Sequence, residues 1–314
     1  MHMKEISAKP PVRIKQKKYR DAASGLLMAL PPVVGFFLFG FIPQLVSLWL
    51  GFQELHSFDF SQAKFTGFSN FAAIFSDPAF FKSIGNTFFY MIATVVCIFL
   101  GLGIALLLSA KGVKGKKFFR SVFFIPYVCS VVATTVMWYW IFEKDFGILN
   151  GILGSLFGEG VRVNWLDEEW PFRTALLVML IWSGCGYNII LYQSAIAAVD
   201  RNLYEAAEID GANTLQQFAH ITWPSINPTT FYMLVMGVIK GLQAFTMHQI
   251  WGSQVGGGGP GQSAVTIVYY IYDKAWGSPY RYGMGYASAA SWLLAILIGA
   301  ITVVIFKSKK KESA

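Results

Sequence analysis

The sequence contains few charged residues for its length. Asp, Glu, Lys and Arg make up only 13% of its 314 residues, whereas soluble domains carry about 25%. Hydrophobic residues make up 55%, and the mean hydropathy is +0.50. Long apolar runs accompany this shortage of charge, and about 20 apolar residues are enough to cross a bilayer as a helix. The composition therefore excludes an ordinary soluble domain and predicts an all-α, polytopic membrane protein.

Cysteine and histidine are also scarce, with three and four residues. Cys97, Cys129 and Cys185 all lie inside apolar runs, where small buried thiols are expected rather than disulfides or metal ligands. The histidines are too scattered along the chain for a metal site, and no Ser-His-Asp or Cys-His arrangement is visible. We therefore predict that the chain has no catalytic residues and no metal site, and that it is not an enzyme.

Six membrane spans can be read from the apolar runs. They lie within residues 22–52, 88–110, 121–142, 174–199, 229–251 and 282–306. Pro31, Pro32 and Pro43 are expected to kink the first span or to delay its start. Lys240 lies in the fifth span, and the six runs contain no other Asp, Glu, Lys or Arg.

Positive residues are distributed unequally between the two sides of the predicted spans. Of the 25 Lys and Arg, 17 lie in the two terminal tails, the second-to-third loop and the fourth-to-fifth loop. Because Lys and Arg concentrate in cytoplasmic loops, these segments, and hence both termini, are predicted to be cytoplasmic. The net charge of +8 then predicts contact with anionic lipids and not with nucleic acid.

A short polar segment separates the fourth and fifth spans. Residues 204–209 have the pattern of a short helix, and Gly211 can adopt the left-handed backbone that ends one helix and lets another begin. Pro224 and Pro228 close the segment before the next apolar run. A helix–turn–helix held between two spans is well shaped to bind in a groove on a partner protein.

The same residues resemble the EAA loop of ABC-transporter permeases. The match consists of Glu205-Ala-Ala, then Gly211, Ile221 and Pro224, at the spacing of that loop. Segments that fit the same family lie at Asn86-Thr87, Arg120–Tyr127 and Phe146–Asn150. From about residue 26 to 306, the chain resembles the carbohydrate branch of binding-protein-dependent importers, which includes maltose, lactose and glycerol-phosphate permeases. It departs from the maltose permease in lacking the extra N-terminal spans and the large external domain of that subunit.

The resemblance implies a type I ABC importer permease fold in three parts. These are a basic cytoplasmic tail at 1–24, a six-helix permease domain at 25–306 with a coupling-helix loop at 200–228, and a cytoplasmic C-terminal tail at 307–314. The implied partners are a second permease, two ATP-binding subunits that hold ATP and Mg, and an extracytoplasmic solute-binding protein. The implied location is a bacterial or archaeal cytoplasmic membrane. The residues expected to couple the permease to the ATPase are Tyr204, Glu205, Ala206, Ala207, Asp210, Gly211 and Ala212.

Polar and aromatic side chains gather in the fourth and fifth spans, where they are costly unless they face protein or a water-filled cavity. Gly184, Asn188 and Tyr192 recur every four residues and so share one helical face. Aromatic rings can bind the C–H faces of a sugar, and amides can bind its hydroxyls. Tyr127 and Gly184 also match positions that line the cavity of the maltose-type permease. The predicted substrate-binding residues are Tyr127, Trp182, Gly184, Tyr187, Asn188, Tyr192, Lys240 and Gln243.

Two alternatives to a neutral-sugar importer stay open at this point. If Lys240 faces the cavity, it favours an anionic solute such as glycerol phosphate or a uronate oligosaccharide. An ion-coupled secondary transporter is the other alternative, but it would need an acidic partner at membrane depth. ATP binding by this chain itself is not expected: residues 256–263 have the glycine spacing of a phosphate-binding loop, but Gln262 replaces its lysine.

Overall fold

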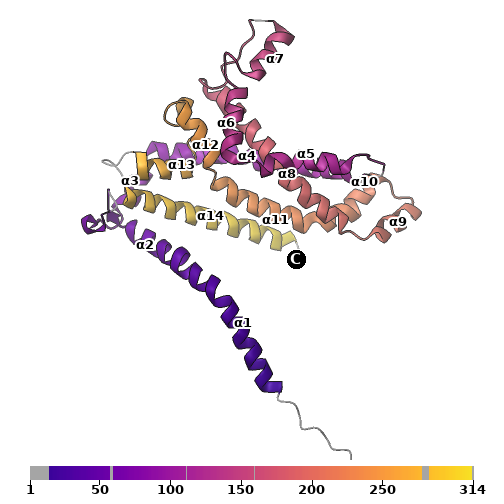
Figure 1. The fold of residues 1–314 in the computed structure, drawn as a ribbon, viewed down its shortest axis with the longest axis horizontal. Coiled ribbons are helices and arrows are strands. Elements are labelled where there is room, and N and C mark those ends of the chain that lie inside the picture. The colour runs from indigo at the N-terminus through magenta and orange to yellow at the C-terminus, as the bar shows by residue number, and fades with distance from the viewer. Residues whose placement is uncertain (1–13, 57–58, 111, 159, 278–282, 313–314) are drawn as a thin grey trace, which may run out of the picture.

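A computed structural model describes residues 14–56, 59–110, 112–158, 160–277 and 283–312. These residues are mostly helical, and the long helices α4, α8, α11 and α14 lie side by side as a bundle (Figure 1). Within the described ranges the strands are β1 (Gln53–Glu54) and β2 (Lys64–Phe65), which pair antiparallel with Gln53 opposite Phe65. The all-α fold class predicted from the sequence is confirmed.

The α-helices are α1 (Ile14–Phe36), α2 (Ile42–Leu50), α3 (Ser69–Phe75), α4 (Pro78–Ser109), α5 (Lys116–Val128), α6 (Val131–Ile141), α7 (Ile148–Phe157), α8 (Glu169–Ala197), α9 (Arg201–Ile209), α10 (Thr214–Gln217), α11 (Trp223–Leu242), α12 (Thr246–Gln254), α13 (Ile267–Tyr272) and α14 (Met284–Glu312). Short π-helical turns are η1 (Phe37–Phe41), η3 (Phe218–Thr222) and η5 (Asp273–Gly277), and 3-10 turns are η2 (Phe60–Gln62) and η4 (Pro260–Gln262).

Membrane spans were predicted at six places, and the described helices agree with five of them directly. The segments long and apolar enough to cross a membrane are Ser24–Leu50, Pro78–Ser109, Glu169–Ala197, Thr214–Gln254 and Met284–Lys309. The predicted third span is divided into α5 and α6, which meet at a bend of 98°. The described part of the chain therefore has up to six spans if the bent pair is counted as one.

The break between α5 and α6 has a local cause and a tertiary one. Pro126 removes a backbone donor from the last turn of α5, and Cys129 then takes an extended conformation with φ −67° and ψ 151°. Beyond the break, α6 packs against α12, and the indole N–H of Trp251 donates to the buried carbonyl of Thr135 at 2.8 Å. Cys129 is exposed at this corner, so its prediction as a buried thiol is wrong.

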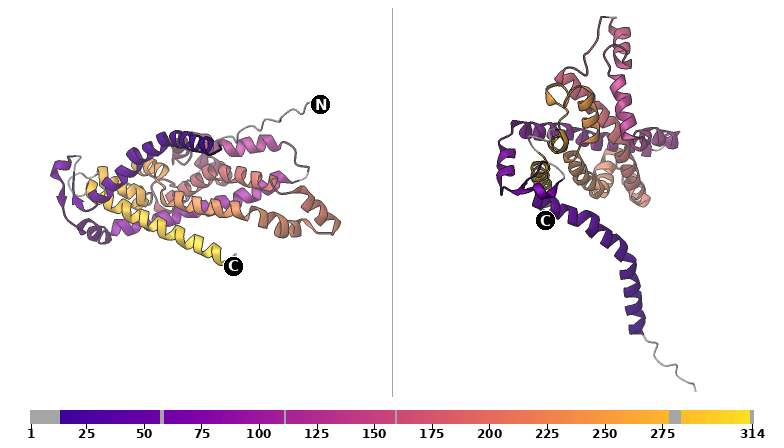
Figure 2. Two further views of the ribbon diagram at one scale, coloured as in Figure 1. Left: turned by 90° about the horizontal axis from the view of Figure 1, so that it is seen from below. Right: turned by 60° about the vertical axis from the view of Figure 1, so that its left-hand side comes forward.

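The first span leaves the bundle. Helix α1 runs away from the other helices, as Figure 1 and the right-hand view of Figure 2 show. None of the most apolar window within Ser24–Leu50 is buried inside the chain. The helix of the first span is interrupted by the π-turn η1, which ends two residues before Pro43. In this turn the amide of Ile42 donates to the carbonyl of Phe37. This long apolar helix is thus left without a covering partner in the described part of the chain.

Helix α4 is the centre of the bundle, packing against α8, α11 and α13. Its neighbours approach closely because glycines lie at the contacts, as is typical of helix packing in membranes. A Cβ on Gly101 would lie 2.7 Å from the Cβ of Asn188, and one on Gly237 would lie 2.3 Å from a methyl of Thr94. These contacts hold α8 and α11 against the same helix, with space for a cavity between them.

The helix α7 at the far end of α6 is attached through one asparagine. Asn150 donates to the carbonyls of Lys144 and Val163, and its side-chain oxygen accepts from the Val163 amide and the Trp165 indole at 3.1 and 3.0 Å. A single side chain therefore closes the loop that follows α6.

The glycine-rich segment 256–263 is folded against α4 rather than left as an open loop. Gly256, Gly257, Gly258 and Gly259 all have positive φ, between +69° and +109°, a conformation that only glycine adopts freely. The amide of Asn86 donates to the carbonyls of Gln262 and Val265, each at 2.9 Å. The Thr87 hydroxyl accepts from the Ile267 amide, also at 2.9 Å. The Asn-Thr pair at the start of the second predicted span is therefore the anchor of this segment.

An ion pair joins the start of α4 to the residues after α13. The Asp77 carboxylate lies 3.2 Å from Lys274 Nζ, and both side chains are largely buried. The Tyr270 hydroxyl donates to the same carboxylate at 2.9 Å and shares a hydrogen bond with the Tyr286 hydroxyl at 2.7 Å. Burial alone would raise the pKa of Asp77, but hydrogen bonds from the Ala79 amide, Tyr270 and Lys274 outweigh it and hold this pKa below its ordinary value.

Replacing Asp77 with asparagine is expected to lower stability by about 1.5–3 kcal/mol at neutral pH, because hydrogen bonds to a charged group are lost. The pKa of Asp77 is lower in the folded state than in the unfolded state, where it is about 3.9. Its contribution is therefore complete above about pH 4 and is lost as the pH falls through the folded-state pKa. Thermal unfolding of both proteins between pH 3 and 7 tests this, and a difference independent of pH would contradict it.

Candidate coupling segment and solute cavity

The segment between α8 and α11 folds as two short helices joined by a glycine turn. Helix α9 starts at Asp200, whose carboxylate accepts the Asn202 amide at 3.0 Å, a standard N-cap. Gly211 has φ +78°, and the Ala212 amide donates to the Ala207 carbonyl at 2.8 Å, which closes the helix end. The second helix, α10, then begins with a capping box between Asn213 and Gln216. The left-handed turn expected at Gly211 is present.

The residues predicted for coupling lie on the outside of this segment. Four of them, Glu205, Ala206, Asp210 and Gly211, are exposed, and the other three, Tyr204, Ala207 and Ala212, are half-buried. The Tyr204 hydroxyl is 2.8 Å from the hydroxyl of Thr222, so it ties α9 to the turn before α11.

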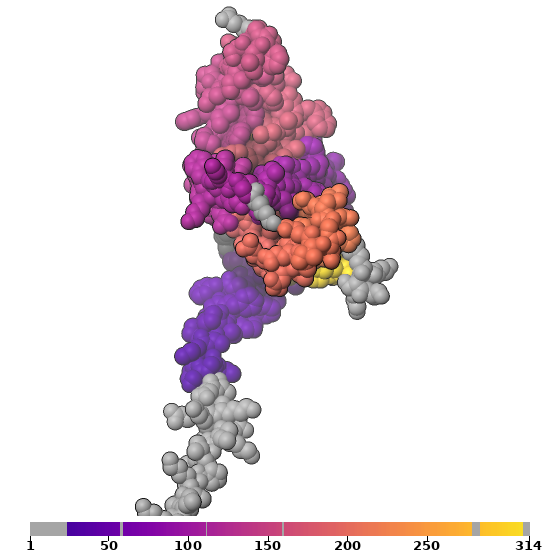
Figure 3. Space-filling view, turned by 90° about the vertical axis from the view of Figure 1, so that its right-hand side faces the viewer, coloured from indigo at the N-terminus to yellow at the C-terminus, as the bar shows by residue number. Residues whose placement is uncertain are grey.

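Three large apolar side chains accompany them on the same segment. Leu203, Ile209 and Leu215 are 50%, 87% and 75% exposed. The segment forms one end of the molecule in Figure 1, and Figure 3, viewed from that end, shows its surface in orange without covering elements. An exposed apolar surface flanked by Glu205 and Asp210 is typical of a protein-docking site.

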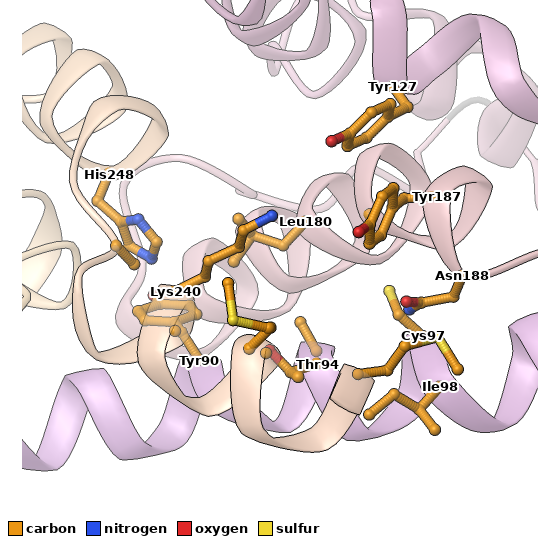
Figure 4. A pocket seen from close by; sticks show the side chains of 17 residues that line it. Tyr90, Thr94, Cys97, Ile98, Tyr127, Leu180, Tyr187, Asn188, Lys240 and His248 are labelled. Atoms are coloured by element: carbon orange, nitrogen blue, oxygen red, sulfur yellow. The ribbon is translucent and has the colours of Figure 1, made fainter. Parts of the chain in front are cut away.

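A second candidate site is a cavity between α4, α8 and α11, closed at one end by α12. Its volume is about 240 Å³. Figure 4 shows its lining side chains. They come from residues Tyr90, Ala93, Thr94, Cys97, Ile98, Tyr127, Leu180, Gly184, Tyr187, Asn188, Met233, Met236, Gly237, Lys240, Gly241, Ala244 and His248.

Five of the eight predicted substrate-binding residues line this cavity. Their rings and polar groups lie together: the Tyr127 and Tyr187 rings stack with centroids 5.2 Å apart, and Lys240 Nζ lies 5.1 Å from the centroid of Tyr187. Gly184 and Asn188, one turn apart on α8, belong to the same wall. Gly184 and Asn188 thus share one face of α8, as their spacing predicted, and that face lines the cavity.

Trp182, Tyr192 and Gln243 are not among the lining residues. Trp182 is 37% exposed and packs edge-on against Trp138, 5.4 Å between ring centroids. Tyr192 is fully buried, and its hydroxyl donates to the Thr230 hydroxyl at 3.1 Å. Gln243 is exposed where α11 ends. The structure thus separates these three side chains from the cavity.

Sequence reasoning missed three polar residues of the cavity. Tyr90 and Thr94 lie four residues apart on α4, on the face that continues to Cys97, and this spacing was a usable signal. His248 gave no such signal, because it follows the break between α11 and α12 that turns it back toward the bundle. Its ring lies 4.7 Å from that of Tyr90.

The chemistry of the lining favours binding over reaction. Stacked phenol rings offer flat apolar faces, and Asn188, Thr94 and Lys240 offer hydrogen-bonding groups beside them. A lysine near the middle of a span costs about 2.5–3.5 kcal/mol. Lys240 and Tyr127 are exposed in the single chain, so the cavity is open on their side.

Two thiols lie close together at the cavity wall. Cys97 itself lines the cavity and Cys185 lies behind it, with their Sγ atoms 3.3 Å apart; Cys97 also donates to the Ile181 carbonyl at 3.4 Å. Both are free cysteines, and they connect α4 with α8.

Comparisons with known proteins identify the family of the chain. A family model described as "Binding-protein-dependent transport system inner membrane component" matches residues 97–310. The chain is 31% identical over 288 residues to the probable ABC transporter permease protein YurN of Bacillus subtilis, covering 90% of this chain and 96% of that protein. It is 32% identical over 305 residues to the arabinooligosaccharides transport system permease protein AraP of the same organism, covering 95% and 93%.

A solved structure has the same fold. The chain is similar to one in a bacterial alginate ABC transporter in complex with an alginate pentasaccharide-bound periplasmic protein, with a TM-score of 0.74. The two share 22% sequence identity, and the match covers 93% of this chain and 96% of the other.

Proposed function

Because the chain belongs to the family of binding-protein-dependent transport system inner membrane components, we propose that it forms part of the membrane path of an ATP-driven importer for a sugar or oligosaccharide. It is an ABC importer permease that crosses the membrane several times. The observation that carries the proposal is the pairing of a solute-sized cavity between the spans with a protruding helix–turn–helix at one end of the bundle. The relative AraP, named for arabinooligosaccharides, supports a carbohydrate as the solute.

The coupling role belongs to the protruding segment. Tyr204, the 205–207 run and the 210–212 turn would enter a groove on an ATP-binding subunit, where ATP and Mg are held and hydrolysed. The exposed Ile209 and Leu215 provide apolar area for that contact, and Glu205 provides a charge that can pair with a cation or a backbone amide of the partner. Closure of the ATP-binding subunits around ATP would then move α9 and with it the ends of α8 and α11.

The solute role belongs to the cavity. The stacked Tyr127 and Tyr187 would bind an apolar sugar face, and Asn188 would bind hydroxyls. Gly184 lets α8 approach Cys97 closely, because a Cβ at this position would lie 3.1 Å from Cys97 Sγ. Trp182, Tyr192 and Gln243 stay predictions without support from the cavity geometry. The cavity lies near the middle of the spans, as alternating access requires.

Surfaces that this chain leaves uncovered suggest where a second permease and a solute-binding protein would bind. The unburied apolar helix α1 and the open side of the cavity fit a second permease that completes the membrane path. The opposite end of the bundle from α9 would receive the solute-binding protein. Both termini and the coupling segment would then lie in the cytoplasm of a bacterium or archaeon, beside anionic lipids, as the distribution of Lys and Arg predicts.

ATPase activity of the assembled complex tests this proposal. The chain would be co-purified with its second permease and ATP-binding subunits, reconstituted in nanodiscs, and mixed with binding proteins loaded with different saccharides. We expect one loaded binding protein to raise ATP hydrolysis severalfold over the empty binding protein. Failure of the ATP-binding subunits to co-purify, together with transport that persists when ATP is depleted, would overturn the proposal.

A further inference from the structure

The cavity has a positive end. Lys240 is the cation among its lining residues, and the lining contains no Asp or Glu. None of the ion pairs within the described ranges includes Lys240; its recorded interaction is with the face of the Tyr187 ring, 5.1 Å away. A ring face compensates an ammonium only partly. The amino group is therefore left facing the cavity without an anionic partner from the described part of this chain.

A second polar group lies at the same end without a partner. His248 is 1% exposed, and its Nε2 has no hydrogen-bond partner among the described residues. Figure 4 shows the Lys240 side chain extending between His248 on one side and Tyr187 on the other. Buried polar nitrogens are rarely left unpaired in folded proteins, so such a nitrogen in a cavity wall points to a missing ligand group.

The rest of the wall is suited to a sugar ring. Tyr127 and Tyr187 offer stacked rings, and Asn188, the residue after Tyr187 on α8, adds an amide. The Lys240 ammonium lies over the Tyr187 ring, 5.1 Å from its centroid, on the side of the tyrosine pair that faces His248. A saccharide that carries one acidic group would use both parts of the cavity at once, because its ring meets the tyrosines while its anion meets Lys240.

We infer that the solute is an acidic saccharide, whose anionic group binds between Lys240 Nζ and His248 Nε2. This inference rests on the proposed function and adds the substrate class to it. Carboxylate, phosphate and sulfonate groups share the required chemistry, since each accepts several charge-assisted hydrogen bonds. The competing explanation is a carboxylate from the second permease that neutralises Lys240 in the assembled complex.

Direct binding to the assembled complex separates these explanations. Saturation-transfer NMR on the complex in nanodiscs, without a binding protein, would compare a hexuronate disaccharide, its carboxyl-reduced neutral counterpart and a hexose phosphate. We expect an acidic probe to bind the wild type at least about tenfold more tightly than the neutral one, which corresponds to about 1.4 kcal/mol. Comparing the affinities of the hexuronate and the hexose phosphate shows which anion the cavity prefers.

Substitutions test whether Lys240 and His248 cause the preference for the acidic probe. Lys240→Met is expected to abolish the preference for the acidic probe, and Lys240→Arg to retain it because the charge remains. His248→Gln, which keeps a side-chain N–H donor, is expected to retain part of it. Lys82→Met removes the same charge from an exposed place on α4 and serves as the matched control.

The outcomes are distinguishable from failure of the proposed function. Equal binding of acidic and neutral probes to the wild type would overturn the inference, as would a preference that survives in Lys240→Met. Loss of assembly in Lys240→Met and Lys240→Gln but not in Lys240→Arg, with no preference in the wild type, would assign Lys240 to a carboxylate of the second permease and also overturn it. Stimulation of ATP hydrolysis by a binding protein loaded with a neutral sugar alone would leave the importer function standing while this inference fails.

Discussion

Replacing Gly211 with aspartate is expected to reduce binding-protein-stimulated ATP hydrolysis and transport by at least about tenfold. Gly211 has φ +78°, a conformation that costs an ordinary residue about 1–2 kcal/mol. Apart from its two chain neighbours, no described residue has an atom within 4 Å of a Cβ built on Gly211. The aspartate side chain therefore clashes with nothing in the described part of the chain. The substitution strains the turn between α9 and α10 and changes the surface that this turn presents to a partner.

A matched control uses a second glycine with the same backbone requirement. Gly67 has φ +58° and is equally free of neighbours within 4 Å, but lies in the loop between β2 and α3. Gly67→Asp should cost similar backbone strain and leave co-purification of the ATP-binding subunits and basal ATP hydrolysis near the wild-type level. Glu205→Lys should behave like Gly211→Asp, because it reverses an exposed charge on α9.

Transport and co-purification together decide the coupling role. If Gly211→Asp and Glu205→Lys both transport normally while the ATP-binding subunits co-purify with each variant, this segment does not dock on the ATPase. If the subunits no longer co-purify and transport is lost, the segment is a docking site, as proposed.

Replacing Asn86 with leucine is expected to lower the stability of the bundle by about 3 kcal/mol. Asn86 is 2% exposed and donates to two carbonyls of the glycine-rich turn while accepting from the guanidinium of Arg173 at 2.8 Å. Leucine has a similar size but leaves the carbonyls of Gln262 and Val265 without a donor, and each unpaired buried group costs about 1–3 kcal/mol. Arg173 keeps its contacts with Glu169 and with the Phe89 ring.

Two measurements check this expectation. Thermal unfolding should occur at lower temperature, and amide hydrogen exchange should speed up over residues 256–265, whose backbone Asn86 holds. Gln254→Leu is the control: it also replaces an amide side chain with leucine, but at an exposed position near the same turn. It should change neither the unfolding temperature nor the rate of hydrogen exchange. A loss below about 1 kcal/mol, with unchanged exchange in the turn, would show that the carbonyls find other partners. Asn86→Asp separates the contributions, because it keeps the acceptor for Arg173 and loses the two donors.

The helix–turn–helix fold of residues 201–217 was predictable because its signals are local. Gly211, the N-cap Asp200 and the capping box at Asn213 each act over three or four residues, and helices begin and end according to such short-range contacts. The spacing that resembles the EAA loop lies within a single stretch of chain for the same reason. The structure added which residues of the segment are exposed.

The cavity was predictable only in part. Gly184 and Asn188 were found because a helix repeats its faces every three to four residues. Tyr192 follows the same repeat but is buried against Thr230 of α11, and the cavity ends before this turn of α8. Tyr90 and His248 come from α4 and α12, and only the packing of those helices brings them to within 4.7 Å of each other.

The sequence by itself determined that the protein is helical, spans a membrane several times and belongs among the ABC importer permeases, because hydropathy, charge distribution and a local motif are properties of the chain alone. Tertiary structure decided the 98° bend between α5 and α6, the folding of the glycine-rich turn onto Asn86, and which side chains face the cavity. These features depend on contacts between residues far apart in the chain. Asn86 and Gln262 are 176 positions apart, and no pattern within one helix specifies which distant backbone carbonyl its side chain will meet.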